Sequence, residues 1–119
     1  MIQGMPNCTY DDAVDLVRIY CNDVLEKYGW NDVEIIGIKL HGSRLRGQAK
    51  PDSDLDAVVE YSGNVKEYAM FNALNDEDYG RCYIDGILVD INPIRREETG
   101  TMSDYMMESD SYDKEMLRN

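Results

Sequence analysis

A hydrophobic segment, a Gly-Ser pair and two closely spaced aspartates follow one another in the first half of this chain. The segment from Val33 to Leu40 is apolar enough to form a buried strand, and Gly42 and Ser43 come almost directly after it. When a strand leads through such a turn into a short helix, free backbone N–H groups point towards an anion. We therefore expect a phosphate-binding turn at Gly42 and Ser43.

The aspartate pair lies at the start of the next apolar stretch. Asp54 and Asp56 flank Leu55, and the two-residue period of a strand would put both carboxylates on one face. Two like charges held side by side require a cation between them. Either aspartate alone would be read as a strand-end cap or as a solvated edge residue.

A third aspartate interrupts the apolar segment 87–94. Ile87, Val89 and Ile91 would face a core, whereas Asp90 would face the opposite side of the sheet. A charge in the middle of such a strand is costly to bury unless another group pairs with it. Three aspartates downstream of a Gly-Ser turn favour a functional site over three unrelated structural residues.

This set of motifs resembles the minimal nucleotidyltransferases of the DNA polymerase beta-like superfamily. The resemblance covers about residues 33–94 and rests on Gly42, Ser43, Asp54, Asp56 and Asp90. It implies an α/β (α+β) fold in which a small mixed sheet of about four strands is flanked by helices.

The resemblance also implies a role for each matched position. Asp54 and Asp56 would bind divalent metal, with two Mg²⁺ ions expected, and Asp90 would complete the catalytic and metal-binding set by helping to activate an acceptor hydroxyl. Gly42 and Ser43 would hold the terminal phosphates of a nucleoside triphosphate, with ATP expected as the substrate.

The charge of the chain bears on its partners. Among 119 residues, 24 are acidic and 12 are basic, which gives a formal net charge of -12 and disfavours free DNA or RNA as a partner. A group of basic residues around the Gly-Ser turn nevertheless suits a triphosphate. Its members are Lys39, His41, Arg44, Arg46 and Lys50.

Several arginines could contact phosphate. Arg44 or Arg46 would neutralise the departing pyrophosphate, and which of the two instead pairs with surface acids is left open. Arg95 and Arg96 could also reach phosphates, but a surface role is at least as well supported. His41, the only histidine, fits a hydrogen bond at the strand end better than a catalytic base.

Cysteine use and the hydrophobic segments indicate the compartment. Cys8, Cys21 and Cys82 are widely spaced and odd in number, which supports neither a disulfide framework nor a zinc site. The first residues lack the features of a signal peptide, and no run approaches the length of a membrane span. We expect a cytoplasmic protein with no membrane contact.

The local patterns predict the remaining elements. A helix should begin after the N-cap Thr9 and end at Gly29, and a second should occupy residues 65–74. Asp85 and Gly86 predict a two-residue hairpin turn before the strand that carries Asp90. Residues 76–78 read as a solvated loop, and Pro93 predicts that strand pairing weakens there.

We expect a single domain, residues 1–119, with a helical tail at about 101–119. Methionines and tyrosines approximate one face of that tail: Met102, Tyr105, Met106, Tyr112 and Met116. Packing on the domain's own sheet is the default expectation for this face, and docking of a partner protein is the alternative.

The sequence supports three functional hypotheses. The first is a nucleotidyltransferase that moves AMP from ATP onto a hydroxyl of a partner protein or small molecule, as the resemblance implies for antitoxin-type members. The second is a non-catalytic module that neutralises a toxin-like partner by contact, with a vestigial nucleotide site. The third is a recognition domain of a larger assembly, which rests on the tail alone.

Overall fold

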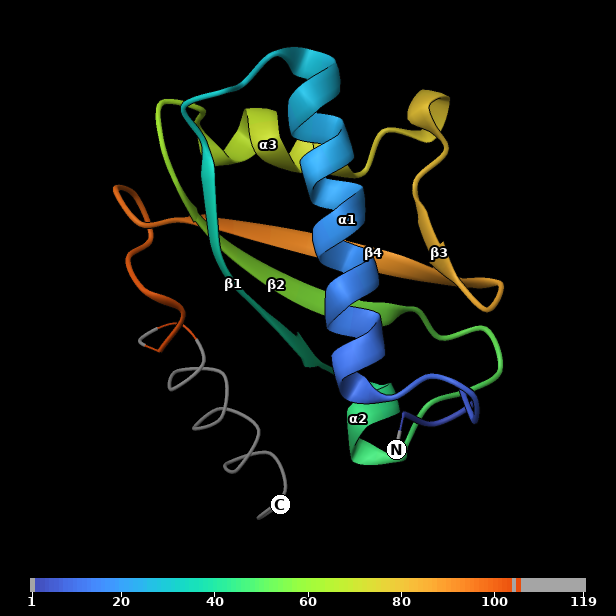
Figure 1. Cartoon of the computed structure of the whole chain (residues 1–119). Coiled ribbons are helices and arrows are strands. Elements are labelled where there is room, and N and C mark those ends of the chain that lie inside the picture. Colours follow the sequence, from blue (N-terminus) through green and yellow to red (C-terminus); the bar gives the residue numbers. More distant parts are fainter. Residues whose placement is uncertain (1, 104, 106–119) are drawn as a thin grey trace.

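The chain folds into a mixed β-sheet that carries its two longest helices on one face, as the computed structural model shows (Figure 1). The structure describes residues 2–103 and 105. In chain order the elements are α1 (Tyr10–Tyr28), β1 (Glu34–His41), α2 (Ser43–Arg46), β2 (Leu55–Ser62), α3 (Glu67–Leu74), the 3₁₀ helix η1 (Glu77–Tyr79), β3 (Cys82–Ile84) and β4 (Ile87–Arg95). The expected α+β architecture is confirmed.

The four strands lie in the order β1-β2-β4-β3. β1 and β3 run antiparallel to their neighbours, whereas β2 and β4 pair in parallel at the centre of the sheet. Parallel neighbours need a long crossover connection, and the chain between β2 and β4 supplies it with α3, η1 and β3.

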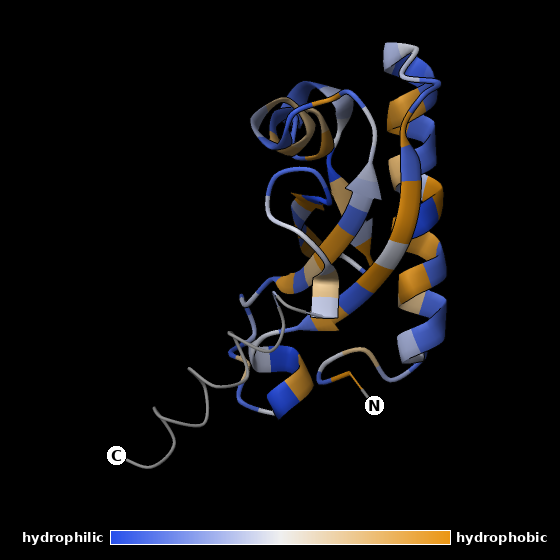
Figure 2. Cartoon of the chain, turned by 90° about the vertical axis from the view of Figure 1, so that its left-hand side faces the viewer, coloured by the Kyte–Doolittle hydropathy of each residue, from blue (hydrophilic) through white to orange (hydrophobic). Residues whose placement is uncertain are grey.

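Helix α1 forms as its sequence predicts. The side chain of Thr9 accepts a hydrogen bond from the Asp12 backbone N–H, and the Asp12 carboxylate accepts one from the Thr9 N–H, which completes a capping box. Gly29 ends the helix in the left-handed conformation, with φ of 69°. Hydrophilic and hydrophobic bands alternate along the ribbon of α1 (Figure 2), and Cys21 belongs to its buried stripe.

The two faces of the sheet differ. Buried residues of α1 and α3 pack with Leu55, Ala57 and Val59 of β2 in the main core. The intervening residue Val58 belongs to a second, smaller cluster with Ile94, against which Met102 and Tyr105 pack. Because side chains alternate across a strand, Asp56 lies on the face of Val58, away from the two helices.

The β3–β4 hairpin forms as predicted. Asp85 and Gly86 have φ of 52° and 78°, the two positive values that a type I′ turn requires. The effect of Pro93 was predicted only in part. Pairing between β3 and β4 stops at Val89, but β4 continues to pair with β2 through Pro93 and on to Arg95, so the proline is tolerated because its other side has no neighbouring strand.

One further expectation needs adjustment. The segment 76–78 is not wholly a loop, because η1 begins at Glu77 with a hydrogen bond from the Asp78 N–H to the side chain of Asp76.

Within the described part of the tail, Asn92 Nδ2 donates a hydrogen bond of 2.8 Å to Tyr105 Oη. Met106, Tyr112 and Met116 lie outside the described residues. No helix in the described part of the chain has the length and hydrophobicity needed to cross a bilayer.

Candidate active site

Strand register brings two of the three aspartates together. Asp56 on β2 is the direct partner of Asp90 on the parallel strand β4, and His41 at the end of β1 is opposite Asp56 on the other side. Neighbouring strands are about 4.8 Å apart, so the three side chains come from adjacent backbone positions. Asp54 lies just before β2 and is exposed.

The Gly42-Ser43 turn packs directly against the Asp56 carboxylate. A Cβ atom placed on Gly42 would collide with Asp56 Oδ2 and would lie only 3.1 Å from Asp56 Cγ. Gly42 also has φ of 92° and ψ of -169°, a region open essentially only to glycine. The glycine is therefore required both by the backbone and by the approach of the carboxylate.

The turn leads into α2 through the carbonyl oxygen of Gly42, which accepts hydrogen bonds from the N–H groups of Leu45 and Arg46. The side chain of Ser43 is half-buried, and it makes no hydrogen bond within the described part of the chain. The Ser43 hydroxyl can therefore bind a ligand.

The electrostatic surroundings of Asp56 are unfavourable for its charge. Burial raises the pKa of this carboxyl group above its ordinary value, and the negative charges of Asp90 and Asp54 raise it further. The charges of His41 and Arg46 lower it, but the net shift is upward. A bound cation would relieve this repulsion.

The Arg44 side chain is held by backbone carbonyl groups of two neighbouring segments. The residue is only 4% exposed. Nε and Nη2 donate to the carbonyl oxygen of Ser53 at 2.9 and 2.6 Å, and Nη1 donates to the carbonyl oxygen of Gln3 at 2.8 Å. These hydrogen bonds support a structural role for Arg44 in the loop and favour Arg46 as the arginine that would contact phosphate. Because Ser53 precedes Asp54, Arg44 instead fixes the backbone that carries the first aspartate.

The N-terminal segment is a part of the site's framework that the sequence analysis missed. Ile2 and Met5 are buried, and the Gln3 side chain exchanges two hydrogen bonds with the Ala49 backbone, at 2.9 and 2.7 Å. In Figure 1 the N-terminus lies beside α2 at the foot of α1. The segment thus braces the connection between the turn and Asp54. The apolar character of Ile2 and Met5 was the one available signal.

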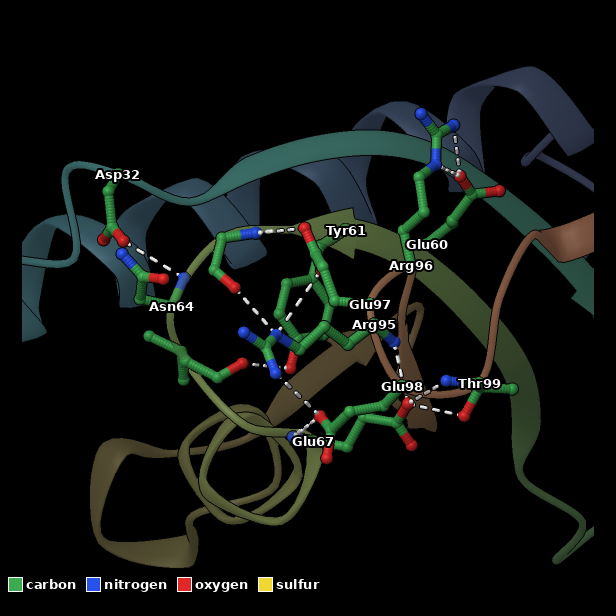
Figure 3. Close-up of polar contacts among 12 residues, drawn as sticks. Asp32, Glu60, Tyr61, Asn64, Glu67, Arg95, Arg96, Glu97, Glu98 and Thr99 are labelled. Atoms are coloured by element: carbon green, nitrogen blue, oxygen red, sulfur yellow. Dashed lines mark hydrogen bonds and ion pairs between the residues drawn. The ribbon is translucent and has the colours of Figure 1, made fainter.

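Arg95 and Arg96 lie at the other end of β4, about 16 Å along the strand from Asp90. Arg96 pairs with Glu60 at 2.7 Å, and Arg95 Nε donates to the Gly63 carbonyl oxygen at 2.7 Å (Figure 3). Glu67 accepts a hydrogen bond from the Arg95 backbone N–H in the same cluster. These contacts support a structural role for both arginines rather than a contact with phosphate.

The Asp90 side chain is 49% exposed, so a ligand can reach its carboxylate from solvent. The face of the sheet that carries Asp56 is covered in part, because Met102 and Tyr105 pack against Val58 and Ile94 there. A separate cavity lies between the start of α1 and the β3–β4 turn and contains none of the motif residues. It is lined by Asn7, Cys8, Asp12, Asp15, Leu16, Ile84 and Asp85.

The aspartates supply the type of oxygen ligand that a divalent metal requires, but their carboxylates do not surround a common point. Carboxylate oxygens are the hard ligands that Mg²⁺ prefers. Among residues 2–103 and 105, however, no group of three His, Cys, Asp or Glu side chains is arranged so that it could hold a metal ion. Asp90 is instead paired with Arg81, whose Nη2 lies 3.5 Å from Asp90 Oδ1. A metal site would therefore require the carboxylates to draw together.

The fold and the site together define a nucleotidyltransferase of the polymerase beta-like class. The family described as the nucleotidyltransferase domain matches residues 18–108, which is more than half of the 119-residue chain, and the chain belongs to this family. The matched segment includes the Gly-Ser turn and all three aspartates. Comparisons with curated proteins and with solved structures found no match.

Proposed function

We propose that this enzyme transfers a nucleoside monophosphate, AMP from ATP, to a hydroxyl group of a partner protein or small molecule in a metal-dependent reaction. The observation that carries the proposal is the register of Asp56 beside Asp90, with Gly42 packed against the Asp56 carboxylate. The resemblance to minimal nucleotidyltransferases adds a biological setting, in which an antitoxin-type enzyme modifies its toxin partner.

Each residue of the site has a proposed task. Asp54 and Asp56 would hold Mg²⁺, and Asp90 would join them from the side open to an acceptor. The metal would neutralise charge on the triphosphate and lower the pKa of the acceptor hydroxyl. The Ser43 hydroxyl would bind the terminal phosphates, and Arg46, which is close enough for its charge to lower the pKa of Asp56, would face the departing pyrophosphate.

The reaction then needs positioning more than covalent chemistry. The acceptor oxygen would attack the α-phosphorus and form a new P–O bond. The bond from the α-phosphorus to the bridging oxygen would break, and pyrophosphate would leave with the bonding electrons. Asp90, as the most exposed of the paired carboxylates, would accept the proton that the hydroxyl loses.

Charge supports a protein as the acceptor. A net charge of -12 repels polyanions, whereas a basic partner would be attracted and would associate quickly at low salt. The exposed carboxylate of Asp90 would be accessible to a side-chain hydroxyl presented by such a partner.

The test uses ATP labelled at either the α- or the γ-phosphate, incubated with Mg²⁺ and with proteins that co-purify with the chain. We expect α-label, but not γ-label, on an acceptor whose intact mass increases by one AMP. Asp56→Asn should abolish the transfer without lowering the melting temperature, because it removes like-charge repulsion. Transfer of γ-label would contradict the proposal. If the Asp56→Asn variant neutralises a toxin-like partner as well as the wild-type protein does, and the mass of the partner does not change, the non-catalytic binding module would be favoured.

A further inference from the structure

Arg81 is a site residue that none of the motifs includes. It lies one position beyond the last β3–β4 pair, Cys82 with Val89, and therefore next to Asp90. Its φ of 51° is in the left-handed region, which is unfavourable for a residue with a Cβ atom. An arginine at such a position suggests that its side chain is needed there.

The contacts of its guanidinium connect the aspartate to the scaffold. Arg81 Nη2 lies 3.5 Å from Asp90 Oδ1 and 3.2 Å from Asn75 Oδ1. The Asn75 amide in turn contacts β4, since Nδ2 donates to the Ile91 carbonyl oxygen at 2.9 Å and Oδ1 accepts from the Ile91 N–H at 3.3 Å. Asn75 thus occupies the edge of β4 beyond the end of β3.

Packing alone does not explain this arginine. Its side chain is 18% exposed, and its Nε is buried without a hydrogen-bond partner among the residues that the structure describes. Leaving such a donor unsatisfied is unfavourable. The cation is nevertheless held beside the carboxylate that faces Asp56 across the strand pair.

We propose that Arg81 is a positioning residue, which serves as the counter-ion of Asp90 until a divalent cation replaces it. This inference rests on the proposed function, because it assumes that Asp90 is a metal ligand. The guanidinium reduces the repulsion between Asp56 and Asp90 in the metal-free protein. It also competes with the metal, so that the free protein binds a divalent ion weakly until a nucleotide contributes phosphate oxygens.

Mn²⁺ binding without nucleotide, measured by electron paramagnetic resonance, tests this competition. Arg81→Asn removes the charge, and asparagine tolerates the left-handed backbone. Because partly exposed ion pairs are weak, we expect Mn²⁺ affinity to rise about two- to fivefold. Lys66→Gln is the matched control, since Lys66 is exposed, precedes α3 and carries the same charge. The Lys66→Gln variant should bind Mn²⁺ with the affinity of the wild-type protein.

A double-mutant cycle separates positioning from a general structural effect. In an Asp90→Asn background, Arg81→Asn should no longer change Mn²⁺ affinity, because the proposed effect acts through Asp90. Unchanged or weaker binding by Arg81→Asn alone, or an equal gain in Lys66→Gln, would overturn the inference while leaving the proposed function intact. A wild-type protein that binds neither Mn²⁺ nor Mg-ATP would overturn both.

Discussion

Replacing Gly42 with alanine should disturb the site through one identifiable contact. The added methyl group would overlap Asp56 Oδ2 and would approach Asp56 Cγ to 3.1 Å and Cβ to 3.3 Å. Because Asp56 Cβ is attached to the backbone of β2, rotating the carboxylate cannot relieve the whole overlap. The carboxylate must move away from the turn, and the strand must shift with it.

The expected cost combines two terms. Alanine in the backbone region of Gly42 costs about 1–3 kcal/mol, and forcing an extra methyl group into a packed contact costs about 1–3 kcal/mol more. We expect Gly42→Ala to destabilise the protein by about 3 kcal/mol. With an unfolding entropy of about 2.1 cal/mol/K per residue, this lowers the melting temperature by roughly 12 °C.

Gly47 offers a control at the other end of α2. It has φ of 71°, but a Cβ atom there would meet nothing within 4 Å. Gly47→Ala should therefore cost only about 1 kcal/mol, from the left-handed backbone alone. Both variants would be compared by thermal unfolding and by calorimetric titration with Mg-ATP, and only Gly42→Ala should lose nucleotide affinity.

The double variant Gly42→Ala with Asp56→Ala identifies the contact itself. Removing the Asp56 carboxylate eliminates the overlap with Oδ2 and Cγ, so the two substitutions should together cost less than the sum of their separate costs. Strict additivity, or equal costs for Gly42→Ala and Gly47→Ala, would refute the reasoning.

Two further predictions concern charge and framework. Because the pKa of Asp56 is raised by burial and by the neighbouring aspartates, the folded state retains a proton that the unfolded chain has lost as pH rises from about 4. The wild-type protein should therefore lose stability relative to the Asp56→Asn variant as pH rises above about 4. A difference in urea-unfolding free energy between the two proteins that does not change with pH would contradict this. Arg44→Lys keeps the charge but cannot reproduce the hydrogen bonds to Ser53 and Gln3. It should cost about 1–3 kcal/mol by urea unfolding, and a neutral effect would show that the loop does not depend on this arginine.

The elements that the sequence predicted well are those specified locally. The Thr9 cap, the Gly29 stop and the Asp85-Gly86 turn each depend on neighbouring residues, and each formed as expected. The adjacency of Asp56 and Asp90 could also be anticipated, because alternation fixes the face of each strand and the resemblance supplies the pairing.

The features that the sequence could not predict depend on distant backbone atoms. Arg44 donates hydrogen bonds to the carbonyl oxygens of Gln3 and Ser53. Because every residue has a backbone carbonyl, no pattern of side chains predicts which ones an arginine will contact. Arg81 reaches Asp90 only because β3 and β4 form a hairpin, and its positive φ has no sequence signal of the kind that glycine provides.

The central claim is that the aspartates create a site for a metal-bound nucleoside triphosphate. Calorimetric titration of ATP into the wild-type protein, with Mg²⁺ and then with excess chelator, tests this claim most directly. We predict binding with Mg²⁺, and its loss both in chelator and in the Asp54→Asn variant, because the carboxylates otherwise repel the triphosphate. Equal ATP affinity with and without Mg²⁺ would contradict the metal-dependent site.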